Sequence, residues 1–115
     1  GTSTPMNDRS ESAAMHAVFG ADVKRVSVSS TKSAMGHLIA AAGAVEAAVC
    51  ALAIRDGVLP VNANYENLDP DCDLNLVVGA PRKQSPRVVL SNSLGFGGSN
   101  SCLAFRHPDF EGGRR

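Results

Sequence analysis

The sequence VSSTKSAMGHLIAAAGAVEAAVCALAIR, residues 28–55, decides the fold because it joins a strand, a polar turn and a long apolar segment. Val26 and Val28 alternate with serines, which predicts a short strand. The side chains of residues 29–31, Ser-Ser-Thr, are expected to end that strand by hydrogen-bonding locally. From about residue 35 to residue 54 the chain has no proline and has apolar residues on nearly every helical face. This pattern predicts a long helix that is buried on all sides.

His37 falls in the first turn of this predicted helix. The partial positive charge of a helix N-terminus disfavours an imidazolium ion, so we expect a neutral ring that can donate a hydrogen bond to a developing oxyanion. A single histidine in such a position can equally be a core side chain with satisfied hydrogen bonds. The residues alone leave both interpretations open.

Glu46 follows His37 by nine residues, about 900° of helical rotation, so the two side chains are expected to point to opposite sides of the helix. A buried carboxylate needs a cation or several hydrogen-bond donors nearby. Lys32, in the polar turn, and a bound metal ion are the two candidates for that cation.

The N-terminal residues predict a loop followed by a helix. Thr2 and Thr4 precede a proline and are expected in the loop, where threonines most often face solvent. Asp8 and Glu11 have the spacing of a capping box, so the helix is predicted to begin after Asp8 and to stop at Gly20. Its apolar side would consist of Ala13, Ala14, Met15, Ala17, Val18 and Phe19.

The chain beyond the long helix is predicted to be less regular. Gly57 and Pro60 indicate a helix stop. An irregular stretch over residues 61–73 should be followed by a short strand over residues 74–78. Residues 83–87 are expected to be an exposed polar connector.

Two apolar runs, residues 88–90 and 103–105, flank the glycine-rich sequence LGFGGSN of residues 94–100. Such an arrangement predicts an antiparallel hairpin. A phosphate-binding P-loop is excluded, because the Gly-Lys-Ser/Thr ending is missing and no helix pattern follows. The glycines around Phe96 let the backbone approach a substrate closely, so the Phe96 N–H could donate to an oxyanion while the ring gates the entrance.

The composition limits the classes of partner. The 115 residues fit one domain with a core of its own, and 11 basic residues balance 11 acidic ones. Neither a nucleic acid nor a membrane surface is favoured by this charge, and the apolar run over residues 38–54 is too weakly hydrophobic to span a bilayer. No signal peptide is visible in these residues, although a fragment would not show one. Three cysteines without C-x-x-C spacing indicate neither a disulfide framework nor a zinc site, so we expect a reducing cytoplasm.

Three motifs resemble the β-ketoacyl-acyl carrier protein synthases, the condensing enzymes of fatty-acid and polyketide assembly. They are, in chain order, Gly-Thr-Ser-Thr-Pro at residues 1–5, T-K-S-x-x-G-H-L at residues 31–38 with A-A-G-A-V-E at residues 41–46, and Asn-Ser-Leu-Gly-Phe-Gly-Gly at residues 92–98. The resemblance runs to about residue 105 and covers only the C-terminal part of such an enzyme. In the family the first motif is H-G-T-[SG]-T-P, so this chain begins directly after that histidine, and the nucleophilic cysteine lies further upstream.

The resemblance implies an α/β architecture, the C-terminal half of a thiolase-like fold, with a mixed sheet and the long helix buried between two sheets. Residues 1–107 would form the synthase C-terminal domain, incomplete at its N-terminal end. Residues 108–115 are expected to be a flexible tail.

The implied reaction is a decarboxylating Claisen condensation between an acyl group held on cysteine and malonyl-acyl carrier protein. His37 would be the second of two neutral histidines that donate to the enolate oxygen. Lys32 would hold that network and bias ionisation at the site, although its exact role stays open. Phe96 would combine the donor and gate functions described above.

Other residues would bind substrate or support the site. The resemblance implies that Thr2 and Thr4 hydrogen-bond the phosphopantetheine arm that carries the substrate. Glu46, Ser91 and Asn92 could form a monovalent-cation or hydrogen-bonded structural site behind the catalytic residues. No cofactor and no catalytic metal are implied.

The implied partners are acyl carrier protein, the missing N-terminal half and a second copy of the intact enzyme. None of Cys50, Cys72 and Cys102 lies in a context like the nucleophile motif, so the chain alone should lack condensing activity, whether it is a fragment, a part of a cleaved chain or a split subunit. Leu94 replaces a phenylalanine common in the fatty-acid enzymes, so the pathway and the acyl chain length stay open.

Two alternatives remain. A non-catalytic partner subunit like the chain-length factors would have lost the active-site residues, whereas Lys32, His37 and Phe96 are all present. A thiolase-type enzyme would use coenzyme A thioesters, but T-K-S before G-H-L is the wrong signature for it.

Overall fold

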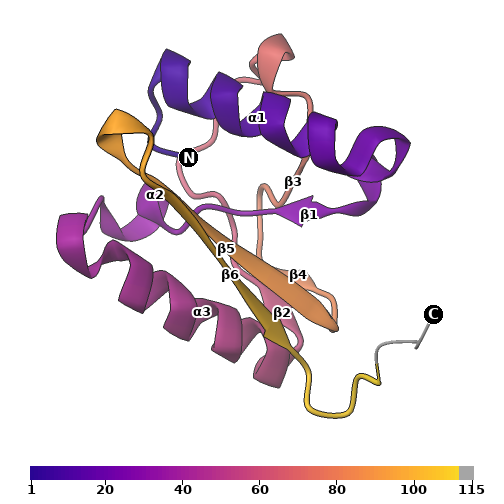
Figure 1. The fold of residues 1–115 in the computed structure, drawn as a ribbon. Coiled ribbons are helices and arrows are strands. Elements are labelled where there is room, and N and C mark those ends of the chain that lie inside the picture. The colour runs from indigo at the N-terminus through magenta and orange to yellow at the C-terminus, as the bar shows by residue number, and fades with distance from the viewer. Residues whose placement is uncertain (112–115) are drawn as a thin grey trace. The chain divides into compact units, whose positions relative to one another are not determined.

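The computed structural model describes residues 1–111, and it divides the chain into two compact units (Figure 1). Unit 1 contains residues 1–38 and 59–82, and unit 2 contains residues 39–58 and the chain from residue 83 onward. The length had predicted one domain with its own core. Within the described residues, however, only Val23, Ala53, Leu59 and Val77 are buried hydrophobic side chains, too few for one continuous core.

Thirteen helical and strand elements lie within residues 1–111. Unit 1 holds α1 (Pro5–Phe19), η1 (Gly20–Arg25), β1 (Ser27–Val28), α2 (Lys32–Met35), η3 (Pro70–Cys72) and β3 (Asn75–Leu76). Unit 2 holds η2 (Ile39–Ala41), α3 (Ala42–Asp56), β5 (Val88–Leu94), η4 (Phe96–Gly98) and β6 (Asn100–Arg106). The chain passes from one unit to the other after residue 38, within β2 (Val58–Leu59) and within β4 (Arg82–Lys83).

Helix α1 begins at Pro5, because proline suits the first turn, where its missing N–H needs no partner. The predicted start after Asp8 was therefore wrong. The predicted stop is confirmed, since Gly20 takes a positive φ of 52° and its N–H bonds to the carbonyl of His16. The expected apolar side is largely exposed in this chain, with Val18 at 76% exposure, whereas Ser12 is the buried residue of the helix.

Strand β1 confirms the expected strand, although only Ser27 and Val28 belong to it. It pairs in parallel with β3, with Ser27 opposite Asn75 and Val28 opposite Leu76. Arg82 ties this pair together, because its guanidinium donates to the Ser27 hydroxyl, the Asn75 side-chain oxygen and the Leu76 carbonyl, each at 3.1 Å. Val23, Leu59 and Val77 are buried hydrophobic side chains of unit 1.

The long helix is interrupted near its expected start. One turn, α2, ends at Met35, and Gly36 then takes φ 80° and ψ 173°, a conformation that residues with a Cβ rarely adopt. Regular helix resumes only at Ala42 and continues to Asp56, where Gly57 in the left-handed conformation stops it as predicted. The prediction of a continuous helix from about residue 35 was therefore wrong over residues 36–41.

Helix α3 packs against the β5–β6 hairpin in unit 2 (Figure 1). The antiparallel hairpin confirms the sequence prediction, with pairs from Val88 opposite Arg106 to Leu94 opposite Asn100. Small residues allow close packing: a Cβ added to Gly43 would lie 3.8 Å from the Ser93 hydroxyl oxygen. Ser91, on the same face of β5, is 8% exposed.

Helix α3 is not enclosed by the other residues of the range 1–111. Ala53 is its buried residue, and Ala44, Ala48, Ala51 and Leu52 are exposed along one side. These positions follow helical spacing, so they form one continuous apolar face. The expectation of burial on all sides is thus not met by residues 1–111.

The expected tail begins with a turn. The Phe110 N–H donates to the carbonyl of His107 at 3.0 Å, and the Arg87 guanidinium lies 5.7 Å from the centre of the Phe110 ring. Residues 112–115 of that expected tail lie outside the described residues.

Candidate active site

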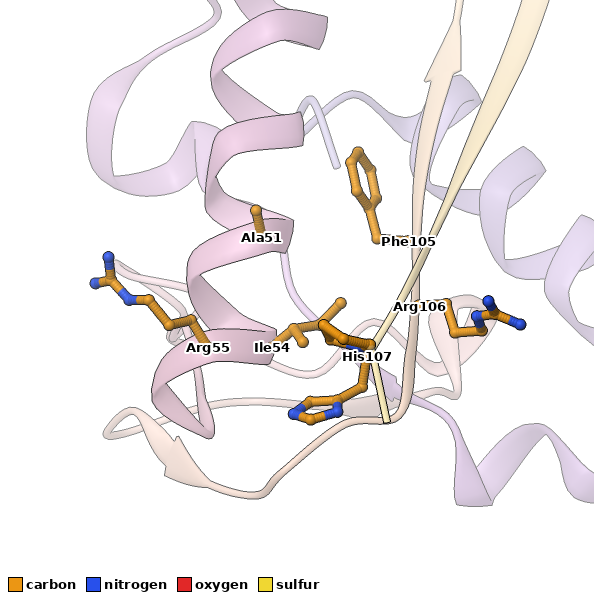
Figure 2. Close-up of a pocket in the computed structure, with 7 residues that line it drawn as sticks. Ala51, Ile54, Arg55, Phe105, Arg106 and His107 are labelled. Atoms are coloured by element: carbon orange, nitrogen blue, oxygen red, sulfur yellow. The ribbon is translucent and has the colours of Figure 1, made fainter. Parts of the chain in front are cut away.

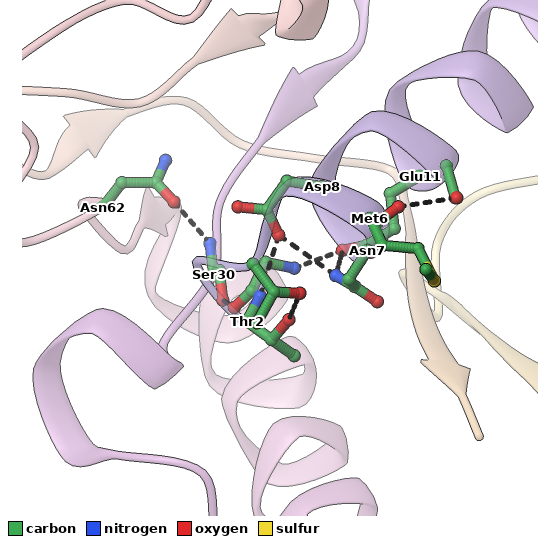
Figure 3. A network of polar contacts seen from close by, with 10 residues as sticks. Thr2, Met6, Asn7, Asp8, Glu11, Ser30 and Asn62 are labelled. Carbon is green, nitrogen blue, oxygen red and sulfur yellow. Dashed lines mark hydrogen bonds and ion pairs between the residues drawn. The ribbon is translucent and has the colours of Figure 1, made fainter. Parts of the chain in front are cut away.

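The threonine loop is held by the first turns of α1 (Figure 3). The Thr2 and Thr4 hydroxyl oxygens lie 3.0 Å apart, and the Thr2 N–H donates to the Asp8 carboxylate at 3.0 Å. The Asn7 amide donates to Asp8 at 3.1 Å and to Glu11 at 2.7 Å. Asp8 and Glu11 were predicted as a capping box, but here they fix the loop and its threonines instead.

The turn that carries Lys32 is joined to distant segments. The Ser29 hydroxyl donates to the Pro60 carbonyl at 2.6 Å, and the Ser30 hydroxyl donates to the Gly1 carbonyl at 3.0 Å. The expectation that these serines bond only locally was wrong. The Ser30 bond has a consequence for the site, because it ties the threonine loop to the turn just before Lys32.

His37 lies in the irregular residues 36–38, between α2 and η2, and its side chain is exposed. It was predicted in the first turn of a helix, where the helix dipole would act on the ring. The structure removes that argument, since α2 ends before His37 and α3 begins after it. The exposure of the imidazole nevertheless argues against the alternative interpretation of His37 as a core histidine.

Phe96 occupies the loop of the hairpin. The Gly95 N–H donates to the Ser99 carbonyl at 3.1 Å, and the Gly98 N–H donates to the Gly95 carbonyl at 3.2 Å. Gly97 and Gly98 have φ values of 75° and 83°, so glycines allow this tight turn. The Phe96 ring has the exposure of a fully solvated side chain, at 107%.

Cys50 lies between Glu46 and Ser91 in unit 2. Burial raises the pKa of the Cys50 thiol, the hydrogen bond with Ser91 lowers it, and the Glu46 charge raises it. Glu46 is one turn before Cys50 on α3, and Ser91 faces that helix from β5. The sequence prediction grouped Glu46 with Ser91 but did not include Cys50. Cys50 follows Glu46 by four residues, a spacing that places two side chains on the same face of a helix.

Asn92 is exposed on the other face of β5, because side chains alternate along a strand. This alternation does not support a shared site for Glu46, Ser91 and Asn92. The shared site stays a prediction. Among residues 1–111, no group of three or more His, Cys, Asp or Glu side chains could hold a metal ion.

A shallow pocket of about 410 Å³ lies in unit 2, between the C-terminal end of α3 and the end of β6 (Figure 2). Ala51, Ile54 and Phe105 give it an apolar floor. Figure 2 shows the Arg55 and Arg106 side chains extending away from each other. None of the predicted site residues lines this pocket.

The predicted residues fall into two groups. Thr2, Thr4, Lys32 and His37 belong to unit 1, where the threonine loop and the Lys32 turn are bonded to each other. Phe96, Glu46, Ser91 and Asn92 belong to unit 2. Within residues 1–111, none of the helices combines the length and apolar character that a bilayer span requires.

Comparison with known proteins gives concordant matches. The family model for the C-terminal domain of β-ketoacyl synthases matches residues 1–66. Nodulation protein E of Rhizobium meliloti is 46% identical over 106 residues, covering 92% of this chain and 26% of that protein. The 3-oxoacyl-[acyl-carrier-protein] synthase 2 of Synechocystis sp. matches with the same identity and coverage.

A solved structure also matches this chain in fold. It contains a type II polyketide synthase acyl-carrier protein in complex with its ketosynthase, bound to the hexaketide, and it matches with a TM-score of 0.92 and 35% identity. The match covers 95% of this chain and 27% of that one. The chain spans about a quarter of the length of the curated relatives it matches.

Proposed function

This chain belongs to the β-ketoacyl synthase family, and from that premise we propose that it forms the C-terminal part of an enzyme that performs decarboxylating Claisen condensations in fatty-acid or polyketide synthesis. It has the α/β, thiolase-like fold of the ketosynthases. The observation that carries the proposal is the 46% identity to a 3-oxoacyl-[acyl-carrier-protein] synthase over 106 residues. Lys32, His37 and Phe96 are all present in that span.

The reaction sets clear demands on the residues. Malonyl-acyl carrier protein loses carbon dioxide and becomes an enolate, whose carbon attacks an acyl thioester held on a cysteine. The new carbon–carbon bond forms as the cysteine thiolate leaves, and the product is a β-ketoacyl thioester. Negative charge develops on the enolate oxygen, so donors that are already in place at that oxygen lower the barrier.

His37 is our proposed donor to that oxygen. Its exposed position after α2 lets the imidazole reach a substrate, and Lys32, the first residue of α2, adds a positive charge five residues earlier. An imidazole N–H at this position would donate a hydrogen bond to the enolate oxygen. The nucleophilic cysteine and the first histidine would come from the part of the enzyme that precedes this chain.

Substrate delivery would depend on the threonine loop. The Thr2 and Thr4 hydroxyls lie 3.0 Å apart and can accept and donate hydrogen bonds, as a phosphopantetheine arm requires. Phe96 would close the entrance with its exposed ring. The partners that this proposal requires are acyl carrier protein, the remaining part of the enzyme and a second copy of the complete enzyme. A structural cation near Glu46 would have no part in the chemical steps.

The complete protein should convert acyl- and malonyl-acyl carrier protein into β-ketoacyl-acyl carrier protein and carbon dioxide. Product formation measured by mass spectrometry, with coenzyme A thioesters in parallel, tests this. Equal turnover of acetyl-coenzyme A without carbon dioxide release would support the thiolase-type alternative. Absence of both acylation and decarboxylation in the complete protein would support the chain-length-factor alternative.

The isolated chain should neither become acylated nor release carbon dioxide. Incubation with a radiolabelled acyl donor is therefore expected to leave it unlabelled. Stoichiometric labelling of Cys50, Cys72 or Cys102 that hydroxylamine removes would contradict the proposal that the nucleophile lies outside this chain.

A further inference from the structure

Residues 62–64, Asn-Ala-Asn, hold the turn that carries Lys32, and we call them the Asn62 segment. The Asn62 side-chain oxygen accepts the Ser30 N–H at 2.8 Å. Its amide nitrogen donates to the Val28 carbonyl at 3.1 Å and to the Val77 carbonyl at 3.0 Å. One side chain therefore joins β1, the residue after β3 and the start of the turn.

Ser33 makes the second set of bonds with this segment. Its hydroxyl donates to the Ser30 carbonyl at 3.0 Å and accepts the Ala63 N–H at 2.8 Å. The Ser33 carbonyl accepts from the Asn64 amide at 3.0 Å. Backbone groups before and after Lys32 are thus fixed by residues that lie some thirty positions further along the chain.

The turn needs these hydrogen bonds because α2 is too short to be stable by itself. Helix α2 has four residues, a single turn, and an isolated helical turn is unstable in water. His37 follows two residues after α2 ends, so the direction of α2 determines where the imidazole lies. Loss of the bonds to Ser30 and Ser33 would allow the turn to move, although the residues of the turn would be chemically unchanged.

We infer that Asn62 is a positioning residue for the decarboxylation step, acting through the turn that carries Lys32 and His37. The inference rests on the proposed function of His37. Asn62 does not itself touch the reacting atoms in this account. Its oxygen faces an N–H and its nitrogen faces two carbonyls, so only an amide satisfies all three partners.

The test uses the complete protein with Asn62→Asp, which keeps the size of the side chain and removes both donors. A displacement of the imidazole by about 1 Å can cost on the order of 10² in rate. We therefore expect carbon dioxide release from malonyl-acyl carrier protein to fall by about that factor, while transfer of the acyl group to the nucleophilic cysteine changes little. A residue that only stabilises the fold would reduce both half-reactions together.

Asn75→Asp is the matched control. The Asn75 side-chain oxygen accepts from Arg82 at 3.1 Å, so an aspartate there keeps its partner and gains an opposite charge. This variant should keep both half-reactions. If Asn62→Asp does not fold, Ser33→Ala decides instead, because it removes the acceptor of the Ala63 N–H without adding a charge.

Equal loss of acylation and decarboxylation, or no loss of either, in the folded variant would overturn the inference. His37→Ala in the same two assays separates this result from a failure of the proposed function. If His37→Ala impairs decarboxylation selectively and Asn62→Asp does not, only the positioning role is wrong. If His37→Ala is itself unselective, the proposed role of His37 fails.

Discussion

At the scale of single residues, two of the side chains with proposed catalytic roles differ in exposure from Cys50 in the same chain. His37 and Phe96 are exposed, whereas Cys50 is half-buried between Glu46 and Ser91. The surroundings of Cys50 favour its neutral thiol, since burial and the Glu46 charge together outweigh the Ser91 hydrogen bond. A reactive cysteine needs the opposite conditions, so Cys50 is suited to packing and not to nucleophilic attack.

The pKa of Cys50 provides a prediction for the complete protein. The alkylation rate of Cys50, followed by mass spectrometry against pH, should have a midpoint above that of the protein unfolded in urea. Because the folded pKa is raised, the contribution of this thiol to stability is present below the unfolded pKa and is lost as the pH rises through the folded pKa. Alkaline pH should therefore destabilise the protein in part through Cys50.

Two variants test the causes separately. Glu46→Gln removes a charge that raises the pKa of Cys50, so its alkylation midpoint should fall. Ser91→Ala removes a hydrogen bond that lowers it, so the midpoint should rise. Shifts in the reverse directions would show that these side chains do not surround the thiol as described.

At the scale of elements, glycines set the limits of the helices. Gly57 ends α3 with φ 64° and an N–H bond to the Ala53 carbonyl, and a Cβ there would lie 2.9 Å from the Ser85 hydroxyl oxygen. Gly57→Ala in the complete protein should lower the free energy of unfolding by about 1–2 kcal/mol, the cost of a left-handed residue with a Cβ. Urea denaturation measures this change.

Gly57→Asn is the matched control, because asparagine tolerates the left-handed conformation better while meeting the same Ser85 side chain. It should cost less than the alanine variant. Equal costs would mean that the contact with Ser85, and not the backbone conformation, determines the effect.

The elements also show how far the sequence predicts the structure. The hairpin and the stops at Gly20 and Gly57 were predictable, because local glycine chemistry and apolar runs determine them. The break at Gly36 was not recognised, although an isolated glycine inside a helical pattern was a warning. Its conformation depends on how the turn is held by residues far along the chain.

The site was predictable to a similar degree. Family motifs suggested Lys32, His37 and Phe96, and their roles stay predictions. Asn62, Ser33 and Asp8 were missed in their observed roles, because each accepts a hydrogen bond from a backbone N–H. The partners of Asn62 and Ser33 are 32 and 30 residues away, and the partner of Asp8 is six residues away. Spacing carries no signal for such bonds. Asp8 was even assigned to a helix cap, since the proline start at residue 5 was overlooked.

At the scale of the whole molecule, the exposed apolar surface indicates that more protein belongs here. The open side of α3, with Ala44, Ala48, Ala51 and Leu52, is accompanied in unit 2 by Leu90 and Leu103 at 44% and 50% exposure. Surfaces of this kind are partner or aggregation sites. The chain spans about a quarter of its curated relatives, so the remaining part of a complete enzyme is the expected cover.

The isolated chain is therefore expected to oligomerise or to lack fixed tertiary packing. Sedimentation together with near-UV circular dichroism should show this, and adding the remaining part of the enzyme should restore a defined species. A monodisperse monomer with a sharp cooperative melt would mean that the open face of α3 needs no partner.

The most direct test of the account separates the two half-reactions in the complete protein carrying His37→Ala. Loss of one oxyanion donor should reduce carbon dioxide release by about 10²–10³, while acyl transfer to the nucleophilic cysteine is largely kept. His16→Ala, at an exposed histidine on α1, is the control and should change neither step. Equal loss of both half-reactions in His37→Ala, or retention of both, would contradict the claim that His37 stabilises the enolate.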